Sequence, residues 1–250
     1  MQKISEMTEA DLARRLDYSV LTHQTDVHYI DDAFEFASEH LFAAVYVLPN
    51  YLKYAVSQMG DFFKKNNVRI GCGPSFPFGC ELTEHKLFGT EQILNLGCTS
   101  VDLMTNISAL KDKRYDYYFN EIKAVVDMAH DAGAICKVIT EVCYLTEEEM
   151  NISTRLVAEA NADYVKLATG QGPKGIPSVE YEIPYVLNEL AELRKEGIGL
   201  NTKLKIAAVN TPKAQNAYCF LNAGVDIIGT QSAKAIIAGL KPIQALNIFQ

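Results

Sequence analysis

The chain has 250 residues, of which 48% are hydrophobic and 22% are charged, and its formal net charge is −8. This length suits one sizeable domain over residues 1–250, and no stretch rich in Pro, Gly or Ser suggests a linker. The acidic balance argues against a protein that coats nucleic acid or an anionic membrane.

The sequence also bears on the compartment of the protein and on the state of its cysteines. The sequence lacks a run of about 18 apolar residues, which a membrane-spanning helix requires. Its polar start, MQKISEMTEADLARRLD, has no apolar signal core. The six cysteines show no CxxC spacing and do not cluster with the histidines, which favours buried, reduced thiols over a zinc site. We therefore expect a cytoplasmic protein.

Short β-rich runs alternate with helical patterns along the whole chain. The expected strands are Leu16–Leu21, Ala43–Leu48, Val68–Gly73, Ser100–Thr105, Ala134–Glu141, Asp163–Thr169, Leu204–Val209 and Val225–Thr230. Many of them are nearly continuous apolar runs, which indicates strands that are buried on both faces.

Helical signals lie between these strands. Apolar residues recur at helical spacing within Tyr115–Ala132, where Gly133 follows as a stop signal, and again at Ile183, Val186, Leu190 and Leu193. Thr146 and Glu149 have the spacing of a capping box. Thr211-Pro212 has the pattern of an N-cap followed by proline in the first helical turn.

This alternation predicts an α/β protein, a single (β/α)8 TIM barrel with an extra N-terminal helix. An open, doubly wound sheet is the main alternative, and it would need a glycine-rich phosphate turn after an early strand. Only GCGPSFPFG, at Gly71–Gly79, comes near that pattern, and its two prolines lead us to reject it as a dinucleotide-binding motif.

Four charged residues interrupt apolar strands. Asp102, Lys137, Lys166 and Lys205 lie on the fourth to seventh expected strands, which are consecutive around a barrel wall. Burying such groups without partners costs several kcal/mol. They could form an internal ion-pair network, but three cations and one anion are poorly balanced for a purely structural role.

A catalytic role would explain that imbalance. Lysine attacks a carbonyl only as the neutral amine, so its pKa must fall well below the ordinary value, and burial and a neighbouring ammonium both lower it. One lysine would then be the nucleophile while another stays charged, and the carboxylate would move protons through a water molecule.

The ordered motifs resemble those of the deoxyribose-phosphate aldolases, class I aldolases built on a (β/α)8 barrel. VDLMTN, KVITE, DYVKLATG and LKIAAVNT resemble the motifs of strands four to seven, LDYSVL resembles LDHTLL near the start, and SFPFG at Ser75–Gly79 resembles the NFPHG loop. The resemblance implies that Lys166 forms the Schiff base, that Lys205 lowers its pKa and that Asp102 relays protons.

The resemblance further implies a Schiff base with a small aldehyde or ketone and reversible aldol cleavage, with a small-molecule aldehyde or sugar (phosphate) as substrate and without a metal or organic cofactor. It implies a substrate-binding set of Lys137, Ser19, Phe76, Thr169, Gly170, Asn210, Gly229 and Ser232. Many members of the family are dimers, so we expect a homo-oligomer, with a dimer favoured. The aromatic run Tyr115–Tyr118 is then a candidate interface.

Departures from the family pattern cluster at the expected phosphate site. Alanines replace the Gly-Gly after Lys205, Asn210 replaces an arginine and Gln171 replaces a lysine, while strand eight keeps one serine in Gly229–Ser232. The group indicates a substrate with a neutral polar end, or a phosphate that is held differently. Lys174 could be a replacement cation or an ordinary surface lysine. Tyr46 stands where the family has a strand-two cysteine.

Three alternatives stay open. His23, Asp26 and His28 could bind a metal, although their spacing matches no site that we can justify. Lys203 lies two residues before Lys205 and could compete for its role. A catalytically silent barrel could act as a binding protein, but it would have no reason to keep buried lysines.

Overall fold

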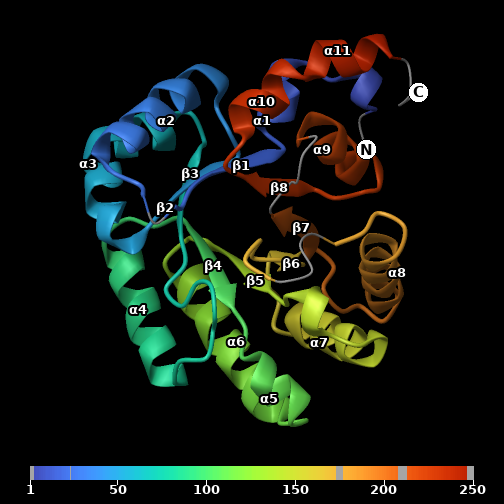
Figure 1. Ribbon diagram of the computed structural model, residues 1–250. Helices are drawn as coiled ribbons and strands as arrows, with labels where there is room; N and C mark the ends of the chain where they lie inside the picture. The colour runs from blue at the N-terminus through green and yellow to red at the C-terminus, as the bar shows by residue number, and fades with distance from the viewer. Residues whose placement is uncertain (1–2, 23, 173–176, 208–212, 247–250) are drawn as a thin grey trace.

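The computed structural model describes residues 3–22, 24–172, 177–207 and 213–246. Eight parallel strands form a closed barrel in the order of the sequence, and helices surround it (Figure 1). The strands are β1 (Leu16–Val20), β2 (Ala44–Val47), β3 (Arg69–Cys72), β4 (Ser100–Met104), β5 (Ile135–Ile139), β6 (Tyr164–Lys166), β7 (Lys203–Ala207) and β8 (Ile227–Thr230). All eight expected strands are present, and the closed order excludes the open sheet.

The helices follow the strands as expected for βα units. They are α1 (Glu9–Ala13), α2 (Val27–His40), α3 (Leu52–Lys65), α4 (Thr83–Asn95), α5 (Ile107–Lys111), α6 (Tyr115–Asp131), α7 (Glu147–Glu159), α8 (Glu182–Lys195), α9 (Lys213–Asn222), α10 (Ala233–Ala238) and α11 (Leu240–Ala245), with short 3-10 helices at Ile4–Glu6, Pro49–Tyr51 and Val142–Tyr144. The expected extra N-terminal helix is α1, which precedes β1.

Local signals explain several of these boundaries. The predicted capping box begins α7, where Thr146 Oγ1 accepts from the Glu149 amide at 3.3 Å and Glu149 Oε2 accepts from the Thr146 amide at 2.8 Å. The four predicted apolar residues of α8 are its buried residues. The Thr211-Pro212 signal lies outside the described residues.

The main apolar core lies between the outer face of the barrel and the helices. Tyr118 belongs to it, because this side chain is 1% exposed and its Oη lies 2.7 Å from Ser153 Oγ on α7. Arg114 covers the ring of Tyr117 at 5.0 Å. Tyr118 therefore packs within its own chain, whereas Tyr115 and Tyr117 are half-buried, and the interface at this run stays a prediction.

The expectation that the cysteines are buried needs correction. Cys72, Cys98 and Cys136 are buried, but Cys80 and Cys219 are exposed, because these two lie in a loop and on the outer part of a helix. Within the described residues, no helix is long and apolar enough to span a membrane.

Candidate active site

A cavity of about 270 Å³ opens at the carboxyl ends of the strands, where barrel enzymes place their chemistry. It is lined by Ser19, Leu21, Phe76, Lys166, Thr169, Gly170, Gln171, Ala207, Lys213, Gly229, Thr230, Gln231 and Ser232. Six members of the expected substrate-binding set are among these residues. Asn210, another member, lies outside the described residues, as does Lys174.

Lys166 forms the floor of this cavity. Strand register pairs it with Lys205 across β6 and β7, and residues that pair in register point to the same side of a sheet. Its Nζ donates to Asp102 Oδ2 at 2.6 Å and lies 5.4 Å from the ring centroid of Phe76. Burial lowers the pKa of Lys166, and the charge of Lys205 lowers it further against the opposing effect of Asp102.

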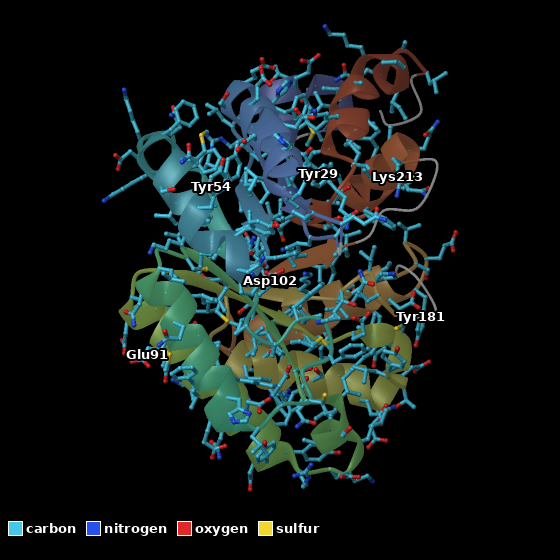
Figure 2. The ribbon with its side chains drawn as sticks, turned by 60° about the vertical axis from the view of Figure 1, so that its left-hand side comes forward. Tyr29, Tyr54, Glu91, Asp102, Tyr181 and Lys213 are labelled. Carbon is cyan, nitrogen blue, oxygen red and sulfur yellow. The ribbon has the colours of Figure 1, made fainter. Side chains whose placement is uncertain are left out.

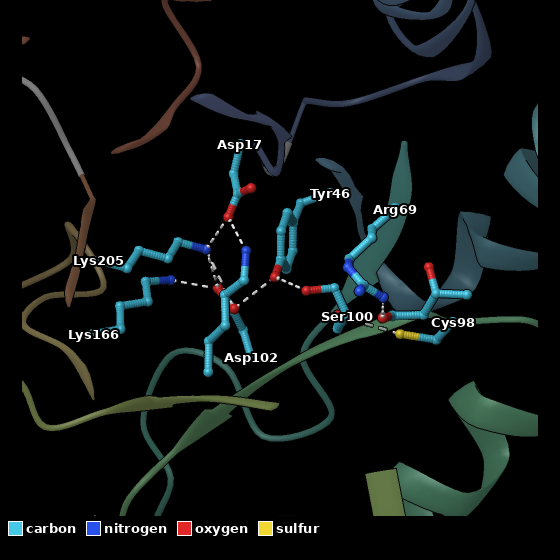
Figure 3. A network of polar contacts seen from close by, with 10 residues as sticks. Asp17, Tyr46, Arg69, Cys98, Ser100, Asp102, Lys166 and Lys205 are labelled. Atoms are coloured by element: carbon cyan, nitrogen blue, oxygen red, sulfur yellow. Dashed lines mark hydrogen bonds and ion pairs between the residues drawn. The ribbon is translucent and has the colours of Figure 1, made fainter. Parts of the chain in front are cut away.

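Lys205 has the opposite behaviour, although it is also buried. Its Nζ lies 2.7 Å from Asp17 Oδ2 and 3.1 Å from Asp102 Oδ2 (Figure 3). Burial alone would lower the pKa of Lys205, but the two carboxylates outweigh it and raise that pKa. The surroundings of the two lysines thus shift their pKa values in opposite directions, that of Lys166 downward and that of Lys205 upward.

Asp102 contacts both lysines (Figure 3) and lies near the middle of the barrel, whereas Tyr54, Glu91 and Tyr181 lie on outer helices and loops (Figure 2). Burial would raise the pKa of its carboxyl group, but Lys166 and Lys205 hold that pKa well below its usual range. Asp102 is therefore an ionised base within contact of the amine of Lys166.

A second carboxylate, Asp17 on β1, was missed in the sequence. It is fully buried, and its Oδ2 accepts from Lys137 as well as from Lys205. Among the described residues, the barrel interior therefore holds three lysines and two aspartates, and not the three-to-one balance that we expected. The signal was available, since Asp17 interrupts the apolar LDYSV strand in the same way as the other four.

Lys137 lies apart from the cavity to which its expected substrate-binding role would assign it. Its Nζ donates to Asp17 and lies 5.3 and 5.1 Å from the ring centroids of Tyr46 and Tyr164. Burial, with a contribution from Lys205, lowers the pKa of Lys137 to about 8 against the effect of Asp17. Lys137 pairs with Asp17 inside the barrel and is not among the residues that line the cavity.

The other candidates are also placed. Lys203 is exposed and lines a separate cavity with Arg69 and Arg194 at the amino ends of the strands, so it does not compete with Lys205. Asp26 caps α2 by accepting from the Tyr29 amide at 2.9 Å, which gives it a structural role, while His23 lies outside the described residues.

Two further residues shape the cavity and were not predicted. The buried Glu141 accepts from the Thr169 amide at 2.8 Å and so holds the loop after β6. Lys213, at the start of α9, brings a second ammonium to the cavity wall. Glu141 stands at the end of the expected strand Ala134–Glu141 and Lys213 lies on a helix, so neither interrupts an apolar run as the barrel lysines do.

Comparison with known proteins gives a consistent result. No protein-family model matches the chain. It is 34% identical over 234 residues to the deoxyribose-phosphate aldolase of Dictyoglomus turgidum, which covers 94% of this chain and 99% of the relative. It is 35% identical over 239 residues to that of Thermococcus kodakarensis, with 93% and 98% covered.

Solved structures agree with these relatives. The aldolase QR15 superposes with a TM-score of 0.81 at 26% identity, covering 94% of this chain and 98% of the other. The tetrameric deoxyribose phosphate aldolase of Aeropyrum pernix gives a TM-score of 0.77 at 25% identity, covering 94% and 93%.

Proposed function

The chain belongs to the deoxyribose-phosphate aldolase family, a family of lyases, and we propose that it is a class I aldolase whose Lys166 forms a Schiff base with a small aldehyde or ketone. One observation carries this proposal. Lys166 is a buried lysine with a lowered pKa that contacts a carboxylate and also lines an open cavity. A buried ammonium with a purely structural role would not need that access.

The reaction follows from these contacts. The neutral amine of Lys166 attacks the carbonyl carbon, and the resulting carbinolamine loses water to give the imine. Asp102, through a water molecule, delivers and removes the protons that these steps require. Loss of a proton from the adjacent carbon gives an enamine, which adds to the acceptor aldehyde. Water then releases the product, and cleavage runs through the same steps in reverse.

The charge of Lys205 has a separate task in this scheme. It keeps Lys166 neutral for a larger fraction of the time, and its own contacts with Asp17 and Asp102 keep it protonated while it does so. In this scheme Lys166 is the nucleophile, and Lys205 on the neighbouring strand is the cation that lowers its pKa.

The substrate is proposed from the relatives and the cavity together. Deoxyribose 5-phosphate is the first candidate, because the relatives are named for it and because Lys213, Gly229 and Ser232 line the cavity. A related unphosphorylated compound is the second candidate, since Gln171 and Gln231 bring neutral amides to the same wall. Comparing kcat/KM for a phosphorylated aldol and its unphosphorylated analogue decides between them.

Borohydride trapping tests the chemistry directly. The protein is incubated with acetaldehyde, dihydroxyacetone or a small ketone, reduced, digested and analysed by mass spectrometry. We expect a covalent adduct on Lys166, its loss in Lys166→Ala and its persistence in Lys203→Ala, which removes an exposed lysine at the other end of the barrel. The absence of any adduct across this panel would favour a silent, ligand-binding barrel.

The proposal extends to the assembly and the compartment of the protein. A homo-oligomer is supported by the tetrameric neighbour from Aeropyrum pernix, and a dimer remains our expectation. We also keep the cytoplasm as the expected compartment. Light scattering coupled to size-exclusion chromatography measures the assembly.

A further inference from the structure

Tyr46 on β2 contacts both groups that flank Lys166. Its side chain points into the barrel and is 1% exposed. Its Oη lies 2.8 Å from Asp102 Oδ1 and 2.7 Å from Ser100 Oγ. Its ring centroid lies 4.3 Å from the Nζ of Lys205. One side chain therefore joins the proton-transfer carboxylate to the charged lysine (Figure 3).

Strand β3, which lies between Tyr46 on β2 and Asp102 on β4, has a glycine where the Tyr46 ring passes. Tyr46 pairs in register with Gly71 on β3, and Gly71 pairs with Ser100 on β4. A Cβ atom at Gly71 would lie only 2.5 Å from the Tyr46 ring. Because this position has no side chain, the tyrosine can cross β3 and place its hydroxyl beside Asp102, two strands away.

The direction of the hydrogen bonds follows from the chemistry of the three groups. An ionised carboxylate only accepts, so Tyr46 donates its one proton to Asp102, and Ser100 must donate to Tyr46. Burial, together with the charges of Asp102 and Asp17, raises the pKa of Tyr46 well above its ordinary value. The phenol therefore stays protonated and remains a donor throughout the pH range of the reaction.

We propose that Tyr46 is a positioning residue for the Lys166 reaction, which holds the ionised Asp102 carboxylate with Oδ2 toward Lys166 while its ring supports the charged Lys205. This proposal rests on the proposed function. Asp102 Oδ2 contacts both lysines, whereas Oδ1 has a contact with Lys205 at 3.3 Å besides the bond from Tyr46. Without the hydroxyl, the Oδ1 side of the carboxylate is left with the longer contact alone.

The reaction itself makes such a neutral donor useful. Lys166 must lose its charge before it attacks, and Asp102 then loses the attraction of its nearest cation. The Tyr46 hydroxyl does not titrate with Lys166, so its bond to Asp102 persists at that stage. Tyr46 thus stabilises the ionised carboxylate when the lysine that pairs with it is neutral.

The surroundings of Asp102 determine what a pH profile reports. The charged groups that face it are Asp17, Lys137, Lys166 and Lys205, from β1, β5, β6 and β7. The buried thiols of Cys72 and Cys98 also lie near it, and burial raises the pKa of each, so they remain neutral. Removing the Tyr46 hydroxyl changes no formal charge in this group.

Tyr46→Phe tests the proposal, because it removes the hydroxyl and keeps the ring below Lys205. We expect kcat to fall by roughly tenfold to a hundredfold, the effect of one hydrogen bond to a charged group, with little change in KM. We also expect the acidic limb of the kcat/KM profile, which follows deprotonation of Lys166, to move to higher pH, because an Asp102 carboxylate without this donor attracts the Lys166 ammonium more strongly.

Tyr118→Phe is the matched control. Tyr118 is equally buried, and its Oη also lies 2.7 Å from a serine Oγ, that of Ser153, but this pair lies between α6 and α7. The control variant should lose stability while keeping the activity and pH profile of the wild type. If Tyr46→Phe behaves in the same way, Tyr46 is merely structural and the proposal is wrong.

Two further measurements test the positioning role if the wild type gives no trapped adduct or if Tyr46→Phe does not fold. If wild-type protein gives no trapped adduct, the proposed function fails, and carbon-13 NMR titration of Asp102 in wild type and Tyr46→Phe still tests the positioning role. An unchanged Asp102 titration would then overturn it. If Tyr46→Phe does not fold, Ser100→Ala replaces it, and this variant should shift the same acidic limb by a smaller amount; no shift would contradict the proposal.

Discussion

Replacing Lys205 by methionine separates Lys166, the proposed nucleophile, from the group that we propose lowers its pKa. The variant removes one buried cation, and each carboxylate keeps a lysine, since Asp17 retains Lys137 and Asp102 retains Lys166. Methionine also fills much of the volume of the lysine stem. We therefore expect the barrel to fold, with its interior reduced to two cations and two anions.

The size of the effect follows from the geometry. The ammonium groups of Lys166 and Lys205 contact the same oxygen of Asp102, at 2.6 and 3.1 Å, so they lie at most about 5.7 Å apart. Two like charges at that distance repel by about 3 kcal/mol at an effective dielectric constant of about 20. Losing this repulsion lowers the ratio of neutral to charged Lys166 by roughly a hundredfold.

The assay is the initial rate of borohydride trapping with acetaldehyde as a function of pH. The reactive amine exists above the pKa of Lys166, so a higher pKa should slow trapping at neutral pH and restore it at alkaline pH. Lys203→Met, on the same strand but exposed, should leave the profile unchanged. A Lys205→Met profile that matches the wild type, or a loss that alkaline pH does not restore, would refute the reasoning.

Three other substitutions test single contacts of the fold. Asp17→Asn leaves two buried lysines short of a counter-charge and should cost about 3–5 kcal/mol in urea denaturation. Because the pKa of Asp17 is lowered in the fold, its contribution should be present at neutral pH and be lost only in acid, so the two unfolding curves should converge as pH falls; parallel curves would contradict this. Gly71→Ala should cost about 1–3 kcal/mol in the same measurement and reduce kcat, since its Cβ would overlap the Tyr46 ring, and unchanged values would mean that the ring moves freely. Thr146→Ala should cost about 1 kcal/mol in thermal unfolding without affecting kcat, because it removes the α7 cap on the outside of the barrel.

The fold was predictable from the sequence because two independent patterns mark each strand. Each is a short apolar run, and a helical pattern of different period separates it from the next. The charged residues were predictable by the same contrast, since Lys166 and Lys205 stand out within such runs. The strand ends were less certain, and β6 is three residues long where we expected seven, because the side chains after Lys166 remain apolar as the chain leaves the sheet.

Pairing inside the barrel could not be predicted in the same way. Tyr46 lies within an apolar strand without interrupting its pattern, and its role depends on the missing side chain of Gly71 on another strand. Lys86 and Glu121 form a buried ion pair between α4 and α6, yet each is an ordinary charged residue on a helix when considered alone. Such contacts depend on how separate strands and helices align in space, and the sequence pattern of one element does not contain that information.

The proposal that Lys166 is the nucleophile rests on an alternating chain of charges and on access to the cavity. Lys137, Asp17, Lys205, Asp102 and Lys166 contact one another in that order. The lysine in the middle contacts two carboxylates, and its pKa is raised. The two end lysines each contact one carboxylate, which they share with Lys205, and the pKa of each is lowered. Electrostatics therefore offers two candidates, and access decides between them, since Lys166 lines the cavity while Lys137 is enclosed by the rings of Tyr46 and Tyr164.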